Sequence, residues 1–176
     1  SPCHPDERIV LRHGPLALTV KTTGQGSAFL KIPALDDDGQ VSLRFVDGTI
    51  IDGTVQVPEL ANLRRFAVQW IDQDTFGVNA FEAGSGYDGV GHISATNPGK
   101  LPLTGSADGG YLMILGDAEA TPAMLAEVYT YPARIAEPVE ISVEAEVTTT
   151  TCGRDLLGEV ITSDRGRSEV SDLVLA

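Results

Sequence analysis

Three consecutive carboxylates, Asp36, Asp37 and Asp38, stand in a turn that is followed by Gly39 and then by an alternating apolar run. Adjacent carboxylates repel one another unless they are solvated or bind a cation, and Ca²⁺ takes several oxygen ligands from a flexible acidic loop. The spacing and the terminal glutamate of an EF-hand loop are missing. The segment therefore predicts either a calcium site or a solvated turn, and the sequence alone leaves both open.

A glycine-rich stretch, residues 83–110, holds residue types that often contact ligands. Long loops in compact domains are frequently functional. Tyr87 and Tyr111 lie near its two ends, and a tyrosine offers a ligand both a ring face and a polar tip. Asp88 and His92 add a carboxylate and an imidazole. We therefore predict that Tyr87, Asp88, His92 and Tyr111 contact a ligand, with a plain turn-rich loop as the alternative.

Two cysteines, Cys3 and Cys152, are the only ones in the chain. An even number of cysteines in an acidic chain without an initiator methionine is typical of an exported, processed protein. The pair predicts one disulfide, and with it a secreted or periplasmic location. The alternative is that both thiols are free.

Glu140, Glu144 and Glu146 share one face of the most regular alternating run in the chain, residues 139–147. Same-face neighbours lie about 7 Å apart along a strand, and glycosidases use two carboxylates about 5–9 Å apart. In this respect the run resembles the β-sandwich glycosidases of the laminarinase type, which implies a carboxylate pair in a concave face. Ser142 occupies one alternate position and departs from that pattern. The other interpretation is a solvated strand face whose charges discourage edge-to-edge pairing.

The elements that must position these residues are strands. Apolar and polar residues alternate along most of the chain, and turn signals such as residues 72–75 separate the runs at short intervals. About ten to twelve short strands are expected, in an all-β, two-sheet antiparallel sandwich or jelly roll. The exception is residues 121–127, where Thr121 as N-cap and Pro122 at the first helical position predict one short helix.

Length and charge narrow the class of protein. A chain of 176 residues is the usual size of one domain, so residues 1–176 are expected to form a single one. The net charge of −13 repels phosphate backbones, which argues against a nucleic-acid partner. The same acidity suits cations, neutral glycans or basic partners. No run of 18 or more apolar residues is present, so no membrane span is predicted.

Three hypotheses about function follow. The first is an exported, non-catalytic β-sandwich that binds a glycan, a protein or another surface component, with calcium as a candidate cofactor. The second is a structural or assembly subunit of an envelope or appendage complex. The third is a glycosidase-like enzyme that uses the 140–146 face. The sequence predicts neither the ligand nor the oligomeric state.

Overall fold

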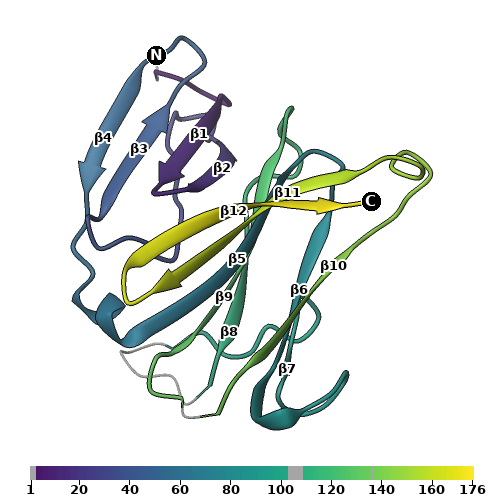
Figure 1. Ribbon diagram of the computed structural model, residues 1–176. Helices are drawn as coiled ribbons and strands as arrows, with labels where there is room; N and C mark the ends of the chain where they lie inside the picture. The colour runs from purple at the N-terminus through teal and green to yellow at the C-terminus, as the bar shows by residue number, and fades with distance from the viewer. Residues whose placement is uncertain (1–2, 103–108, 136) are drawn as a thin grey trace.

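The computed structural model describes residues 3–102, 109–135 and 137–176. These residues form twelve strands in three antiparallel sheets, so the all-β antiparallel prediction is confirmed, with three sheets where the sequence suggested two (Figure 1). The N-terminal sheet has the order β2-β1-β3-β4 and contains β1 (Arg8–His13), β2 (Leu16–Lys21), β3 (Gln40–Arg44) and β4 (Ile50–Thr54). The central sheet has the order β12-β11-β5-β9-β8 and contains β5 (Leu63–Ile71), β8 (Tyr111–Leu115), β9 (Met124–Pro132), β11 (Leu156–Asp164) and β12 (Arg167–Leu175). The three-stranded sheet has the order β10-β6-β7 and contains β6 (Phe76–Phe81), β7 (His92–Ile93) and β10 (Glu140–Ala145). Two 3₁₀ turns, η1 (Pro58–Asn62) and η2 (Glu82–Gly84), complete the elements.

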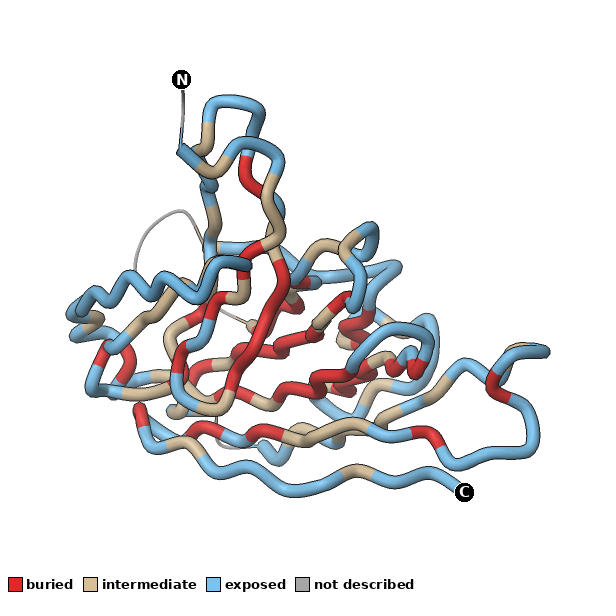
Figure 2. The backbone as a smooth tube through the Cα atoms, turned by 90° about the horizontal axis from the view of Figure 1, so that it is seen from above, coloured by how far each residue is buried: buried red, intermediate tan, exposed pale blue. Residues whose placement is uncertain are grey.

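The central sheet lies between the other two, and its middle strands β5 and β9 are buried on both faces. Successive side chains of a strand point to opposite faces, and in β5 the neighbours Ala67 and Val68 are both fully buried. Ala67 packs in a cluster with β1 and β2 of the N-terminal sheet, whereas Val68 packs in a separate cluster with β6 and β7 of the three-stranded sheet. Figure 2 shows the buried stretches gathered in the interior, with an exposed C-terminal strand. The fold therefore has two apolar cores, one on each side of the central sheet.

The helix expected at residues 121–127 is absent, and that prediction is wrong. Residues 117–123 form turns, and β9 begins at Met124. β9 pairs with β5 on one side and with β8 on the other, so both rows of its backbone groups are hydrogen-bonded. A helix at this place would leave β8 without a partner and β5 with β11 alone, and the pairing overrides the local capping signal. Among the described residues, no helix has the length and apolar character needed to cross a membrane.

The predicted disulfide is also absent. Cys3 and Cys152 are both exposed, free thiols. Cys3 lies against Gly26 in the turn that follows β2, whereas Cys152 lies in the loop between β10 and β11, on another side of the molecule (Figures 1 and 2). A disulfide needs Cα atoms within about 7 Å of each other, so this arrangement does not permit one.

Removal of the cysteines tests this correction. We expect Cys3→Ser and Cys152→Ser to change the free energy of unfolding by less than about 0.5 kcal/mol each, the usual range for exposed positions. A reducing agent should leave the thermal midpoint of the wild type unchanged. Thermal unfolding with and without dithiothreitol is the measurement. If reduction lowers the free energy of unfolding by about 2–5 kcal/mol, the two cysteines do form a disulfide.

Candidate ligand-binding groove

A row of polar side chains crosses one end of the central sheet. Ser163 of β11 stands opposite Arg65 of β5, Arg65 opposite Thr130 of β9, and Thr130 opposite Tyr111 of β8. Residues directly opposite each other project from the same face of a sheet, so the four side chains form one line. This row lies at the end of the apolar core that forms between the central sheet and the N-terminal sheet.

Arg65 is the unusual member of the row because it is a buried cation. Its side chain is only 6% exposed. The guanidinium donates from Nε to Thr130 Oγ1 at 3.1 Å and from Nη1 to the Ala34 carbonyl, and it also contacts the Tyr111 hydroxyl. All three partners are neutral, and no carboxylate within the described ranges forms an ion pair with Arg65. Burial lowers the pKa of Arg65.

Two adjoining pockets, of about 930 and 590 Å³, open beside this row and share Tyr131 and Arg165. Together we call them the arginine groove. Thr130 and Tyr111 line the larger pocket. Arg65 is among the residues of the smaller pocket, although Arg64 and Phe66, which also line it, project from the opposite face of β5 to the Arg65 side chain. The residues of the arginine groove are Glu59, Ala61, Asn62, Leu63, Arg64, Arg65, Phe66, Pro102, Gly109, Tyr111, Thr130, Tyr131, Pro132, Ala133, Arg134, Ile141, Thr162, Ser163, Asp164, Arg165, Arg167 and Glu169.

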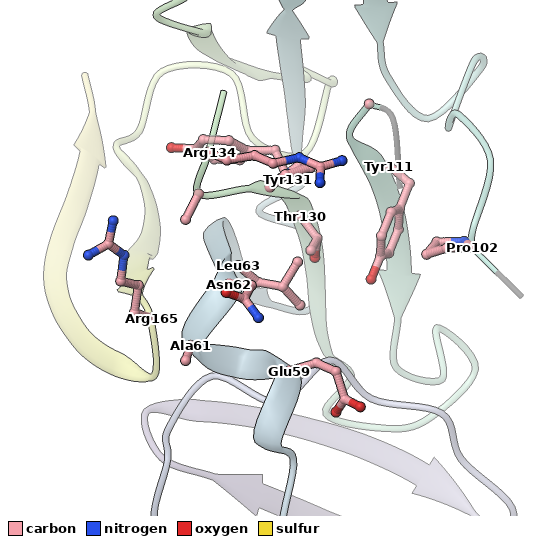
Figure 3. Close-up of a pocket in the computed structure, with 13 residues that line it drawn as sticks. Glu59, Ala61, Asn62, Leu63, Pro102, Tyr111, Thr130, Tyr131, Arg134 and Arg165 are labelled. Atoms are coloured by element: carbon pink, nitrogen blue, oxygen red, sulfur yellow. The ribbon is translucent and has the colours of Figure 1, made fainter. Parts of the chain in front are cut away.

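Figure 3 shows how the larger pocket is built. Arg134 and Tyr131 lie together on one side, Tyr111 and Pro102 lie on another, and Asn62 lies beside Leu63, below Arg134 in this view. The ring of Tyr131 stacks on the buried ring of Tyr129, with centroids 5.2 Å apart, which holds the Tyr131 ring in place. Tyr131 and Tyr111 project from opposite faces of the central sheet, so the larger pocket lies at the end of that sheet.

The charge of the groove is opposite to that of the chain. It collects five of the twelve basic residues but only three of the 25 acidic ones, an excess of two positive charges in a chain of net charge −13. Asp164 already has a partner within the protein, because it accepts a hydrogen bond from Arg64 Nε at 3.0 Å. That bond raises the pKa of Arg64. The arginines are Arg64, Arg65, Arg134, Arg165 and Arg167, and the carboxylates are Glu59, Asp164 and Glu169.

A tight turn brings Arg165 to the groove. Arg165 and Gly166 join β11 to β12 with φ values of 54° and 87°, the positive pair that a two-residue type I′ hairpin requires. Gly166 has no room for a Cβ, which would lie 2.9 Å from the Asp37 side chain. Arginine at positive φ is unfavourable, by roughly 1–2 kcal/mol, compared with glycine or asparagine. A residue with an unfavourable backbone conformation beside a groove is consistent with a functional role for that residue.

The four residues predicted to contact a ligand do not form one site. Tyr111 lines the arginine groove, whereas Tyr87, Asp88 and His92 lie together in the loop region between β6 and β7. Tyr87 is 59% exposed, packs edge-on against the ring of Phe81 with centroids 5.0 Å apart, and donates a hydrogen bond to a carboxylate of β10. Residues 103–108 of the glycine-rich stretch lie outside the described residues.

His92 has a structural role in this second group. It is buried and stacks on Phe81, with centroids 5.0 Å apart. Its Nδ1 accepts the backbone N–H of Asp88 at 3.1 Å, so Nε2 carries the proton and donates to Asn79 Oδ1 at 2.8 Å. Both ring nitrogens are occupied by protein, and neither is available to a metal or a substrate.

Two of the three carboxylates of the Asp36–Asp38 turn form separate hydrogen bonds within the fold. Asp36 accepts hydrogen bonds from the backbone N–H and the hydroxyl of Ser168, the latter at 2.7 Å. Asp38 Oδ1 accepts the backbone N–H of Gln40 at 3.0 Å. Within the part of the chain that the structure describes, no group of three His, Cys, Asp or Glu side chains is placed to hold a metal ion. The calcium prediction gains no support, and the turn is a structural connection to the β11–β12 hairpin.

Asp36→Asn tests that structural role. Asparagine keeps one acceptor for Ser168 but loses the charge, so we expect the free energy of unfolding to fall by about 0.5–1.5 kcal/mol. Asp37→Asn, whose side chain makes no such bond, should change it by less than about 0.5 kcal/mol. Chemical denaturation in CaCl₂ and in EDTA should give the same values. A midpoint that rises in CaCl₂ and no longer does so in Asp36→Asn would contradict this account.

The strand that carries Glu140 and Glu144 contributes Ile141 to the smaller pocket, but its glutamates lie outside the groove. β10 is an edge strand that pairs only with β6, and both side chains are exposed. Glu144 is hydrogen-bonded by the Tyr87 hydroxyl. Neither pocket of the arginine groove includes Glu140, Glu144 or Glu146. The glycosidase hypothesis gains no support from this geometry.

Comparison of the chain with protein-family models, with curated proteins and with solved structures finds no match in any of the three.

Sequence reasoning missed the arginine groove. Its cations come from segments that are far apart along the chain, around residues 64–65, 134 and 165–167, and only the sheet order brings them together. One signal was present. Arg165-Gly166 between two alternating runs marks a hairpin turn with a cation on its tip.

Proposed function

We propose that the protein is a non-catalytic binding module that holds an anionic ligand in the arginine groove. The observation that carries this proposal is Arg65, a cation that is buried without a carboxylate partner. Desolvating a charge costs several kcal/mol unless an opposite charge compensates it. An anion in the adjoining groove supplies the negative charge that the protein does not.

The residues of the groove favour binding over catalysis. They include no histidine and no cysteine, and their one serine, Ser163, donates its hydroxyl proton to the Leu35 carbonyl. A nucleophile needs a base within hydrogen-bond reach, and this serine has none there. Arginines, in contrast, are the preferred residues for recognising planar anions through paired N–H donors.

Calorimetric titration with polyanions tests the proposal. The probes are dextran sulfate and poly-L-glutamate, with uncharged dextran as the blank. We expect at least one polyanion to bind, with an affinity that falls as NaCl is raised. Arg165→Ala should weaken that affinity by about 10–100-fold, the value of a charge-assisted hydrogen bond.

Arg44→Ala is the matched control because it removes the same charge from an exposed position of β3, outside the groove. It should leave the affinity within about twofold of the wild type. Equal losses of affinity in Arg44→Ala and Arg165→Ala would mean that the polyanion binds to surface charge in general and not to the groove. No binding of either polyanion would remove the proposed function.

An assembly subunit is the second candidate, because β4 is an uncovered edge strand. All five residues of β4 are exposed, including Ile50 at 56% and Ile51 at 53%. An edge with free backbone groups and apolar side chains on both faces is suited to pairing with a second copy of this chain. Sedimentation velocity over a range of concentrations tests it. A monomer at every concentration would rule this pairing out.

A further inference from the structure

We infer that the free edge of β10 binds an extended segment of a partner protein, in which apolar residues alternate with lysine or arginine. This inference goes beyond the proposed function and does not depend on it. The observations behind it are a core that is open on one side, a strand edge without partners and carboxylates without ion pairs beside that edge.

The core between the central and three-stranded sheets is open on one side. In its middle, Val68 of β5 and Val78 of β6 are 0% and 1% exposed. Towards the outer strands the burial falls, because Val143 of β10 and Leu173 of β12 pack against this core but are only half-buried. The central sheet has five strands and the opposing sheet has three, so the outer part of the central sheet lacks a full cover.

Two pockets mark the two ends of this open side. The smaller pocket of the arginine groove is lined by Ile141 of β10 and Glu169 of β12. A further pocket of about 510 Å³ is lined by Ala145 of β10 and Leu175 of β12. The space between these two outermost strands is named here the β10–β12 channel (Figure 1). From Glu169 to Leu175 it extends for about 20 Å, the length of a short strand.

The edge of β10 that points away from β6 has free backbone groups. β10 pairs with β6 alone, and within the described ranges no other segment forms a backbone hydrogen bond with its six residues. An extended segment can add to such an edge as a fourth strand. Its alternate side chains would lie beside Ile141, Val143 and Ala145, which point to the core. These inward positions of the added strand are therefore apolar.

The remaining positions of the added strand lie close to carboxylates. Glu140 and Glu144 are exposed on the outer face of β10, and Glu169 is exposed on the channel side of β12. None of these three carboxylates forms an ion pair with a described residue. Arg167 likewise forms none, whereas the other arginines at the ends of the channel pair with Asp74 or Asp164. Those arginines are Arg64, Arg154 and Arg165. The excess of unpaired carboxylates favours lysine or arginine in the partner.

A second copy of this chain does not supply such a segment. Two β10 strands paired antiparallel about Ser142 would place Glu140 opposite Glu144, and like charges directly opposite each other are destabilising. β4 contains no basic residue, and β12 carries one arginine and two carboxylates. The segment that fits the β10 edge therefore belongs to a different protein.

The experiment measures the affinity of the whole chain for synthetic peptides by calorimetry. The probe is a capped peptide of alternating lysine and valine with nine residues, the length of β12. One control peptide has the same composition in two blocks, and the other has glutamate in place of lysine. We expect the alternating basic peptide to bind at least tenfold more tightly than either control.

Two further measurements test where and how the peptide binds. Glu140→Lys should weaken the binding of the alternating basic peptide by about fivefold, from one reversed cross-strand charge. Glu119→Lys is the matched control at an exposed position outside the channel, and it should leave the affinity within about twofold. Hydrogen exchange of the β10 amides should become slower when the peptide binds, because its free edge gains partners.

Each outcome decides for or against strand addition by a basic segment. The expected preference, the loss in Glu140→Lys but not in Glu119→Lys, and slower exchange in β10 support it. If the block peptide binds as tightly, or β10 exchange does not change, charge alone holds the peptide and the inference is wrong. It is also wrong if the glutamate peptide binds more tightly, if no peptide binds, or if β10 exchange slows with protein concentration alone, which would indicate a second copy. None of these results bears on polyanion binding in the arginine groove.

Discussion

Phe76→Ala is expected to lower the free energy of unfolding by about 3–5 kcal/mol, and Leu18→Ala by about 2–5 kcal/mol. Phe76 is fully buried between the central and three-stranded sheets, and Leu18 between the central and N-terminal sheets. Truncation removes apolar contacts and leaves a cavity that a close-packed core fills only in part. The two losses should add, because the residues belong to different cores and share no partner.

Urea denaturation of the two single variants and the double variant is the measurement. Ile114→Ala is the control, since the Ile114 side chain is 62% exposed on β8, and it should cost less than about 0.5 kcal/mol. If Phe76→Ala or Leu18→Ala costs as little as the control, one of the two outer sheets does not pack on the central sheet.

Glu127→Gln is expected to raise the free energy of unfolding at pH 7 by about 1–3 kcal/mol. The wild-type carboxylate is buried with too few hydrogen-bond partners, and the substitution removes the cost of burying that charge. Glu127 is 6% exposed, and its carboxylate accepts the Val78 N–H at 2.7 Å. Burial raises the pKa of Glu127, and the bond from Val78 opposes that shift only in part. Glutamine keeps the acceptor for Val78 without the buried charge.

The sign of the pH dependence follows from the raised pKa. The folded protein holds the Glu127 proton more tightly than the unfolded chain, so ionisation lowers stability as pH rises from about 4 through the raised folded pKa. The advantage of Glu127→Gln should therefore be present at pH 7 and disappear near pH 4. Glu119→Gln, an exposed position with the same change in charge, should show no such dependence. Urea denaturation of wild type and both variants at the two pH values checks this, and a variant less stable than wild type at both would contradict it.

Strand content and strand faces were predictable from the sequence. The alternating run at residues 139–147 forms β10, and its apolar members Ile141 and Val143 pack against the core as expected. Trp70 alternates with Phe66 and Val68 and is buried. Phe45 alternates with Val41 and Leu43 but is only half-buried, against the ring of His4. Alternation predicts which side chains share a face, but it does not show which layer covers that face.

The number of layers and the site were not predictable. Residues 66–70 of β5 are apolar except for Gln69, and this stretch is covered on both faces, a pattern that a two-sheet sandwich does not require. Whether Cys3 reaches Cys152, and whether Arg65 lies beside Arg134 and Arg165, depends on the order of strands within the sheets. That order is set by packing between distant segments, which local spacing does not encode.

If the proposed function is correct, Arg65 serves anion binding and not the stability of the fold. Arg65→Met keeps the volume and removes the charge. The Ala34 carbonyl loses a donor, at a cost of about 1–3 kcal/mol, and the loss of a buried unpaired charge offsets it. We therefore expect the free energy of unfolding to change by less than about 1 kcal/mol.

The measurement is the affinity of Arg65→Met for the polyanion that binds the wild type, taken beside its urea denaturation curve. The account predicts at least a tenfold loss of affinity with little change in stability. A variant that is several kcal/mol less stable and, where folded, binds the polyanion as well as the wild type would contradict it, since Arg65 would then serve the fold alone.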